Sequence, residues 1–415
     1  MKKTIIFLFA LTSLIGFSCT DAFDNTSDSK KIEKISVNFD LTMGVDDLKS
    51  SNLKLYLKNY EENRDYEFPV DGKSVPAKDI IPGVYTVSVV GEGVANDETE
   101  FIMNGNLVNL PLLEDNKNYD VRVRGIMLAS LIFKELYYAG VPSYYFRDQF
   151  YEIYNNSENL IYLDGICFAN LEPTTATEIL PTWPDGTEDY VYADRIWKFP
   201  GNGTDYPLQP GESVVLAQCA RNHMEHNANT KVDLSIAEFE FYTGSTSYPD
   251  MEAINMEHVY YDGQAGTDGL MQYMVSVFGG AYAIFKVPEG ENWDPINDPK
   301  WSVRQLGSDN SQLYAKIPIE YVWDAVELGD NESMVKAKRI PGLLDAGMSW
   351  VGNIYCGLSV ARHIAKDANG NLKKMENGSY IYQDTNNSTN DFVPGIEPEI
   401  RRNDALMPSW NHTLQ

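Results

Sequence analysis

The chain has few cysteines and histidines and a shortage of basic residues. Its 415 residues include four Cys and five His, and its 33 Lys and Arg face 60 Asp and Glu, which gives a formal charge of −27 at pH 7. A chain this acidic has no basic surface for nucleic acid, and anionic lipid headgroups should repel it. Nucleic-acid binding and electrostatic membrane binding are therefore excluded as functions.

The few cysteines do not form a recognisable pattern. Beyond Cys19, the chain contains Cys167, Cys219 and Cys356. Three cysteines cannot all pair within one chain, and none has the C-x-x-C spacing of a zinc or redox site. We interpret them as free thiols that pack like small apolar residues. One disulfide among them stays open as an alternative.

Familiar catalytic motifs are lacking as well. The chain contains no nucleophile elbow, phosphate-binding loop or dinucleotide fingerprint. Among 60 acidic residues a catalytic carboxylate pair cannot be identified, because the sequence does not give the separation of two carboxyl groups. We expect a protein that is not an enzyme, with a hydrolase of scattered acidic residues as the alternative.

One apolar run stands at the N-terminus. It extends from Ile5 to Ile15 behind two lysines and is too short to span a bilayer. A basic start, a short apolar run and small residues before a cleavage point predict an export signal over residues 1–18.

Cys19 follows this signal in the context Gly-x-Ser-Cys, which resembles a bacterial lipoprotein signal. The resemblance implies that the thiol of Cys19 is acylated, for example with palmitate, and becomes the mature N-terminus; an ordinary signal peptide is the alternative. Residues 19–34 are polar and predict a flexible tether. Asp21 and Asp24 resemble the surface-export signals of Bacteroides-type lipoproteins, which implies an outer-membrane lipoprotein exposed at the cell surface.

Residues 35–125 alternate between apolar and polar positions, as strands do. The segment Ile81–Val89 places a Pro-Gly turn before an alternating strand. It resembles a strand of transthyretin-like and carboxypeptidase-regulatory-like modules. We therefore expect an immunoglobulin-like β-sandwich over residues 35–125.

Three segments of the remainder, Leu131–Tyr138, Phe150–Ser157 and Leu208–Ala217, resemble in this order the lamin-tail domain. The resemblance implies a second, larger immunoglobulin-like β-sandwich with long loop insertions over residues 126–415, so the whole chain should be mainly β. Within it we expect a short helix over Ile319 to Leu328. We also expect the polar break Asn155-Asn156-Ser157 to be a turn before a return strand at residues 159–163.

Three further strings are distinctive: Val232–Glu240, Ile317–Val326 and Gln383–Phe392. Behind a lipoprotein signal they are similar to an uncharacterised family of Bacteroides-type lipoproteins. Its members tend to be encoded near TonB-dependent outer-membrane receptors. The resemblance implies a surface protein of an uptake system with such a receptor as its partner.

His223, Glu225 and His226 are the one local cluster of metal-ligand types. On a helix the two His side chains would share a face and would hold a divalent metal, with Glu225 or Asp233 completing the shell. The string is not H-E-x-x-H, so it does not predict a metalloprotease. This predicts a metal site, and a metal- or iron-acquisition accessory protein as an alternative function; an exposed polar loop is the other interpretation.

Tryptophans in polar surroundings are the second candidate signal. Trp183, Trp293 and Trp301 lie beside Pro, Asp, Lys or Ser, outside regular strand patterns, and so does Trp410. Aromatic faces near amides suit sugar or peptide ligands, whereas the alternative is that they plug the ends of the sandwiches. Asn386 and Asn387, in an oxygen-rich stretch, are further ligand candidates, with a turn-rich connection as the alternative. The sequence thus predicts a non-enzymatic surface lipoprotein that binds a protein, peptide or glycan.

Overall fold

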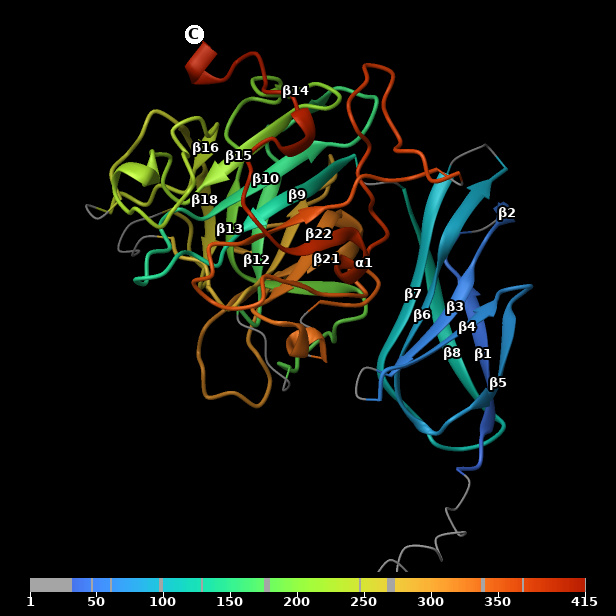
Figure 1. Cartoon of the computed structure of the whole chain (residues 1–415). Coiled ribbons are helices and arrows are strands. Elements are labelled where there is room, and N and C mark those ends of the chain that lie inside the picture. Colours follow the sequence, from blue (N-terminus) through green and yellow to red (C-terminus); the bar gives the residue numbers. More distant parts are fainter. Residues whose placement is uncertain are drawn as a thin grey trace, which may run out of the picture.

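The computed structural model describes residues 32–45, 48–59, 62–96, 100–127, 130–174, 180–245, 248–266, 273–336, 340–367 and 369–414 (Figure 1). The predicted signal and Cys19 lie outside these ranges. The described chain is mainly β and forms several sheets, as the sequence predicted. Its helices are short: α1 (Ser388–Asp391), η1 (His223–Glu225), η2 (Ile319–Tyr321), η3 (Glu332–Lys336), η4 (Arg402–Asp404) and η5 (His412–Leu414). Within the described ranges, none has the length and apolarity to cross a membrane.

The N-terminal part is one eight-stranded sheet that folds over its own core. Its strand order is β4-β3-β6-β7-β8-β1-β5, with β2 paired to β6. The strands are β1 (Ile35–Met43), β2 (Leu48–Ser51), β3 (Lys54–Asn59), β4 (Arg64–Pro69), β5 (Ser74–Ile80), β6 (Gly83–Ala95), β7 (Glu100–Leu112) and β8 (Lys117–Met127).

Alternation in the sequence explains this sheet. Every second residue of β1 from Ile35 to Leu41 is buried, and the residues between them are half-buried. Phe39 is fully buried with Leu55 and Val87, which come from β3 and β6, so the inner faces of the folded sheet meet in one core. The period of two thus places one side of each strand in this core.

The remainder of the chain contains two large sheets that pack face to face, to the left of the N-terminal sheet in Figure 1. The first sheet contains β17 (Ile254–Asn255), β16 (Phe239–Glu240), β15 (Ser213–Ala217), β10 (Phe150–Asn155), β9 (Leu131–Tyr137), β24 (Ser359–Arg362) and β25 (Phe392–Ile396). The second contains β20 (Ser302–Val303), β21 (Tyr314–Pro318), β13 (Tyr190–Lys198), β12 (Cys167–Leu171), β19 (Ala281–Phe285), β22 (Val322–Gly329) and β23 (Ser349–Trp350), with β18 (Glu257–Tyr261) paired to β13.

A large aromatic core lies between these two sheets. Tyr151 of β10 contacts Phe168 of β12 and Tyr282 of β19, with ring centroids 4.9 and 5.0 Å apart. Trp197 of β13 is fully buried in the same core. Fully burying an aromatic or large aliphatic side chain contributes about 1.5–3 kcal/mol, so this core is the main source of stability for the pair of sheets.

Two local predictions were wrong. Ile319 to Leu328 is not a helix: after the single turn of η2, residues Val322–Gly329 form β22, because pairing with β19 overrides local propensity. The segment after the polar break does not return along β10. Only β11 (Ile161–Tyr162) is a strand, and it pairs with β14 (Pro207–Leu208).

The polar break itself is part of the scaffold, as predicted. Asn155 accepts hydrogen bonds from the backbone N–H and the hydroxyl of Ser157 and donates to the carbonyls of Asn159 and Leu208. Asn156 pairs with the backbone of Tyr382 in both directions. These bonds satisfy buried backbone groups that would otherwise lack partners.

The three cysteines after Cys19 are free thiols, as expected. Cys167 and Cys219 are buried and Cys356 is partly buried. Burial raises the pKa of the Cys167 thiol to about 12 and that of Cys219 to about 11. Cys167 and Cys219 therefore pack as small apolar side chains and are not reactive thiolates.

A buried arginine joins the two large sheets at one edge. Arg362 of β24 pairs with Asp324 of β22 at 2.7 Å, and with Asp384 and Asp391 from the connection that leads to β25. Asp324 also accepts the backbone N–H of Phe133 on β9. Burial raises the pKa of Asp324 to about 7; the nearby cation of Arg362 opposes this rise, and the carboxyl of Asp384 adds to it.

We expect Arg362→Ala to destabilise the protein by about 3–5 kcal/mol, because it leaves buried carboxylates without their cation. Urea unfolding monitored by tryptophan fluorescence would measure the loss. Lys231→Ala removes an exposed partner of Glu397 and should change the free energy of unfolding by less than about 0.5 kcal/mol. A loss of under about 1 kcal/mol for Arg362→Ala would contradict a central role for this ion-pair network.

Candidate functional site

The candidate site begins with a β-bulge between β12 and β13. Asn170 of β12 pairs with Arg195, but the next residue, Leu171, pairs with Ala193, so Asp194 is an extra residue on β13. Successive side chains of a regular strand point to opposite faces. A bulge changes the direction of a side chain, and here Asp194 and Arg195 line the same cavity.

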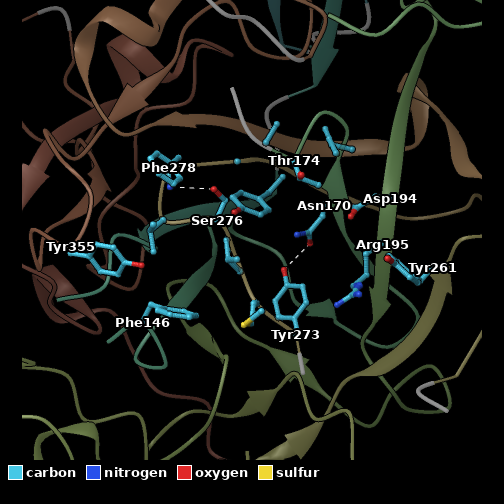
Figure 2. Close-up of a pocket in the computed structure, with 17 residues that line it drawn as sticks. Phe146, Asn170, Thr174, Asp194, Arg195, Tyr261, Tyr273, Ser276, Phe278 and Tyr355 are labelled. Carbon is cyan, nitrogen blue, oxygen red and sulfur yellow. Dashed lines mark hydrogen bonds between the residues drawn. The ribbon is translucent and has the colours of Figure 1, made fainter. Parts of the chain in front are cut away.

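This cavity, which we call the bulge cavity, has a volume of about 680 Å³. Figure 2 shows a polar end, where Asp194, Arg195, Asn170 and Tyr261 gather. At the opposite end lie the aromatic side chains Tyr355, Phe146 and Phe278. Tyr273 lies between the two ends.

Asp194 has one carboxyl oxygen that lacks a hydrogen-bond partner among the described residues. Its Oδ1 atom is buried and accepts no hydrogen bond from the residues that the structure describes. Desolvation raises the pKa of Asp194 to about 7; nearby Arg195 opposes the rise, and Glu172 adds to it. A carboxyl that is half ionised near neutral pH in a cavity is typical of functional sites.

Arg195 does not neutralise this carboxyl by a direct ion pair. Its guanidinium lies over the rings of Tyr261 and Tyr273, at 4.5 and 5.7 Å from their centroids. The Nε–H group is buried and finds no acceptor among the described residues. A carboxylate and a guanidinium thus face one cavity without satisfying each other.

Asn170 adds an oriented amide to the polar end. Tyr273 donates its hydroxyl to Oδ1 of Asn170 at 2.7 Å, as the dashed line in Figure 2 shows. With Oδ1 accepting, the amide Nδ2 group is a donor whose orientation is set. Within the described ranges it donates to no residue.

The aromatic end is built from strained backbone. Tyr355 has φ +52° and Tyr144 has φ +59°. The centroids of their rings are 5.1 Å apart, and Tyr144 exposes 78% of its surface. Left-handed conformations of residues other than Gly cost of order 1–3 kcal/mol when the surroundings impose them. Phe278 exposes 47% of its surface at the same end. Such strain with exposed aromatic groups indicates a binding role.

The predicted metal residues occupy η1 and its end. His223 is buried; its Nδ1 contacts the Tyr145 hydroxyl at 2.6 Å and its Nε2 contacts the Cys219 carbonyl at 2.9 Å. Burial lowers the pKa of His223 to about 4. Among the residues that the structure describes, no three His, Cys, Asp or Glu are placed to hold a metal ion. The metal site with Glu225 and His226 stays a prediction that elemental analysis would decide.

The predicted tryptophans are not among the residues that line the bulge cavity. Trp183 is buried and stacks on Tyr192 at 4.1 Å, and Trp301 is buried with Lys300 over its ring. Trp293 is partly buried and donates to the carbonyl of Lys316. These side chains fill space around β13, β20 and β21, which matches the alternative that they plug the sandwich.

Asn386 and Asn387 have structural partners. The carbonyl of Asn386 accepts from Asn104 of the N-terminal sheet and from the backbone N–H of Ala346. The Asn387 side chain caps α1 by accepting the N–H of Asn390. A ligand role for either residue stays a prediction.

Asp194 and Arg195 were not among the site residues predicted from the sequence. Both lie within the string YVYADRIWKF, where a charged pair interrupts aromatic and β-branched residues. A charged pair inside a buried strand is unusual, because a charged group is rarely buried without a partner. This charged pair within an otherwise apolar strand was the signal in the sequence that could have indicated a functional site.

We expect Asp194→Asn to stabilise the protein above pH 7. The pKa of Asp194 is about 7 in the folded protein, above its ordinary value of 3.8, so folding favours the protonated acid. Ionisation opposes folding as the pH rises from about 4 to about 7, and Asn cannot ionise. The Tm of Asp194→Asn minus that of the wild type should therefore increase between pH 4 and pH 8.

Asp309→Asn, at an exposed loop position, is the matched control and should show no such increase. A Tm difference for Asp194→Asn that is the same at pH 4 and pH 8 would show that Asp194 ionises freely in the folded state.

Comparisons with known proteins place this fold in a family. A family model described as a protein of unknown function, DUF4876, matches residues 209–399. The crystal structure of a DUF4876 family protein from Bacteroides thetaiotaomicron VPI-5482 is 49% identical, over 92% of this chain and 100% of that chain, with a TM-score of 0.69. A search of curated proteins found no match. The expected uncharacterised Bacteroides-type family is thus confirmed, and the chain belongs to the DUF4876 family.

Proposed function

We propose that this protein is a non-enzymatic binding component at the cell surface that holds its ligand in the bulge cavity. The observation that carries the proposal is the pair Asp194 and Arg195, which line one cavity. Oδ1 of Asp194 and the Nε–H group of Arg195 are buried and have no hydrogen-bond partner among the described residues. A buried polar group without a partner costs about 1–3 kcal/mol. A ligand that supplies the missing partners offsets this cost.

The pattern of the N-terminal sequence supports a role outside the cell. Residues 1–18 have the pattern of an export signal, and Cys19 stands where a lipid would be attached. Anionic lipid headgroups would repel this acidic protein, and a lipid anchor would hold it at the membrane in spite of that repulsion. The partner that we infer is a TonB-dependent outer-membrane receptor, to which the protein would present its ligand.

A second candidate function is hydrolysis at the same cavity. Asp194 has a pKa of about 7, and Glu172 is close enough to raise it. Two carboxyl groups with different protonation states are the arrangement that glycoside hydrolysis uses. The binding role is better supported, because Glu172 is not among the residues that line the cavity.

We expect a ligand panel to contain a class that raises the Tm of the purified mature protein. The panel would hold amino acids, peptides and saccharides, and the readout is a thermal shift followed by calorimetric titration. Asp194→Ala with Arg195→Ala should lose the shift, because the cavity then lacks its charged groups, whereas Asp309→Asn should keep it. If no class binds, the binding role is wrong. Turnover of a panel member that Asp194→Asn abolishes would favour the hydrolase.

We expect the full-length protein, captured from native outer membranes, to co-purify with a β-barrel receptor of the TonB-dependent class. The acyl chains would keep the two proteins in one membrane, so Cys19→Ala should be released from the membrane fraction and recover far less receptor. Mass spectrometry identifies the partner and the acylation of the N-terminus. Capture without a receptor, or a mature N-terminus without fatty acid, would contradict the uptake role.

A further inference from the structure

We propose that the ligand of the bulge cavity is an uncharged oligosaccharide. One sugar unit lies at the polar end formed by Asp194, Arg195 and Asn170, and a following unit stacks at the aromatic end formed by Tyr355, Phe146 and Phe278. This inference rests on the proposed binding function and adds the chemical class and the length of the ligand.

The unpaired donors and acceptors at the polar end are suited to hydrogen bonding with sugar hydroxyl groups. Asp194 offers an acceptor without a partner, and Arg195 and Asn170 offer donors without partners. A sugar hydroxyl both donates and accepts. Two neighbouring hydroxyls would therefore donate to Asp194 and accept from Arg195 or Asn170.

Charge favours an uncharged sugar. At the same end of the cavity Arg195 carries a positive charge, and Asp194 carries a negative charge when it is ionised, so a charged ligand would be attracted by one and repelled by the other. The whole chain has a formal charge of −27, which would repel an anionic saccharide during its approach.

The aromatic end accounts for a second sugar unit. The C–H faces of a sugar ring are apolar and pack on aromatic rings, and Tyr355, Phe146 and Phe278 supply such rings across the cavity from Asp194 (Figure 2). The ring of Phe146 lies 6.4 Å from that of Tyr355. A cavity of about 680 Å³ lies within the range of pockets that enclose drug-sized ligands, which exceed one sugar ring.

The strands that line the cavity do not favour an extended peptide. Peptides often bind by adding a strand to a free sheet edge. Here β12 pairs with β13 and β19, β19 also pairs with β22, and β13 also pairs with β18 and β21. Backbone bonding thus occupies both sides of these strands, and the free groups at the polar end are side chains.

The test is calorimetric titration of the mature protein with uncharged mono-, di- and trisaccharides. Each series contains a single type of hexose, and several hexoses are tested in this way. Peptides of matched length are titrated alongside. We expect at least tenfold tighter binding of the di- or trisaccharide than of the monosaccharide. Asp194→Asn should weaken binding at every length by tenfold or more. Phe278→Ala should remove the gain in affinity with ligand length, because the second sugar unit then loses a stacking surface. Phe278 is partly exposed, so its loss should not prevent folding.

A second series separates this inference from the function on which it rests. Disaccharides in which one unit is a uronic acid should bind at least tenfold more weakly than their uncharged counterparts. Binding of peptides without binding of saccharides overturns the sugar assignment and leaves the binding function intact. Equal affinity for mono- and trisaccharides would contradict the binding of a second sugar unit at the aromatic end. Failure of both panels overturns the binding function itself.

Discussion

The salt bridge between Arg362 and Asp324 fixes how the two large sheets meet at one edge, and the aromatic core between the sheets supplies most of their stability. The salt bridge links β24 of one sheet to β22 of the other, and Asp324 also holds the backbone of β9. Charged groups are costly to bury, so they persist in a core only when each finds its counterpart. Arg362 also donates to the carbonyls of Phe133 and Gln383, which ties the connection before α1 to the same edge.

The bulge cavity follows from this arrangement. β22 pairs with β19, β19 with β12, and β12 with β13, so the edge held by Arg362 supports the strands that carry Asn170, Asp194 and Tyr282. The regular part of these strands lies over the aromatic core. The irregular part, one extra residue in β13, turns two charged side chains toward the cavity. A rigid sheet thus positions an irregular site, which is the usual division of roles between scaffold and function.

The sequence allowed the mainly β fold, the free cysteines and the scaffold role of Asn155 to be predicted, because each depends on local pattern or composition. It did not reveal the partners of β11, or that Val322–Gly329 is a strand, because both depend on segments distant in the chain. The candidate ligands were chosen by residue type. Residue type alone did not distinguish Trp183, buried under Tyr192, from Phe278, exposed at the cavity.

By itself, the sequence determined the acidic charge, the alternating strands and the family of this protein, and it predicted an export signal. Net charge, apolar runs and the period of two can all be read from the chain. Only the tertiary structure decided where that chain has a site. The register between Asn170 and Arg195 makes Asp194 an extra residue, and the burial around it raises the pKa of its carboxyl to about 7. Register and burial arise from pairing between distant strands, and no single segment of the sequence contains them.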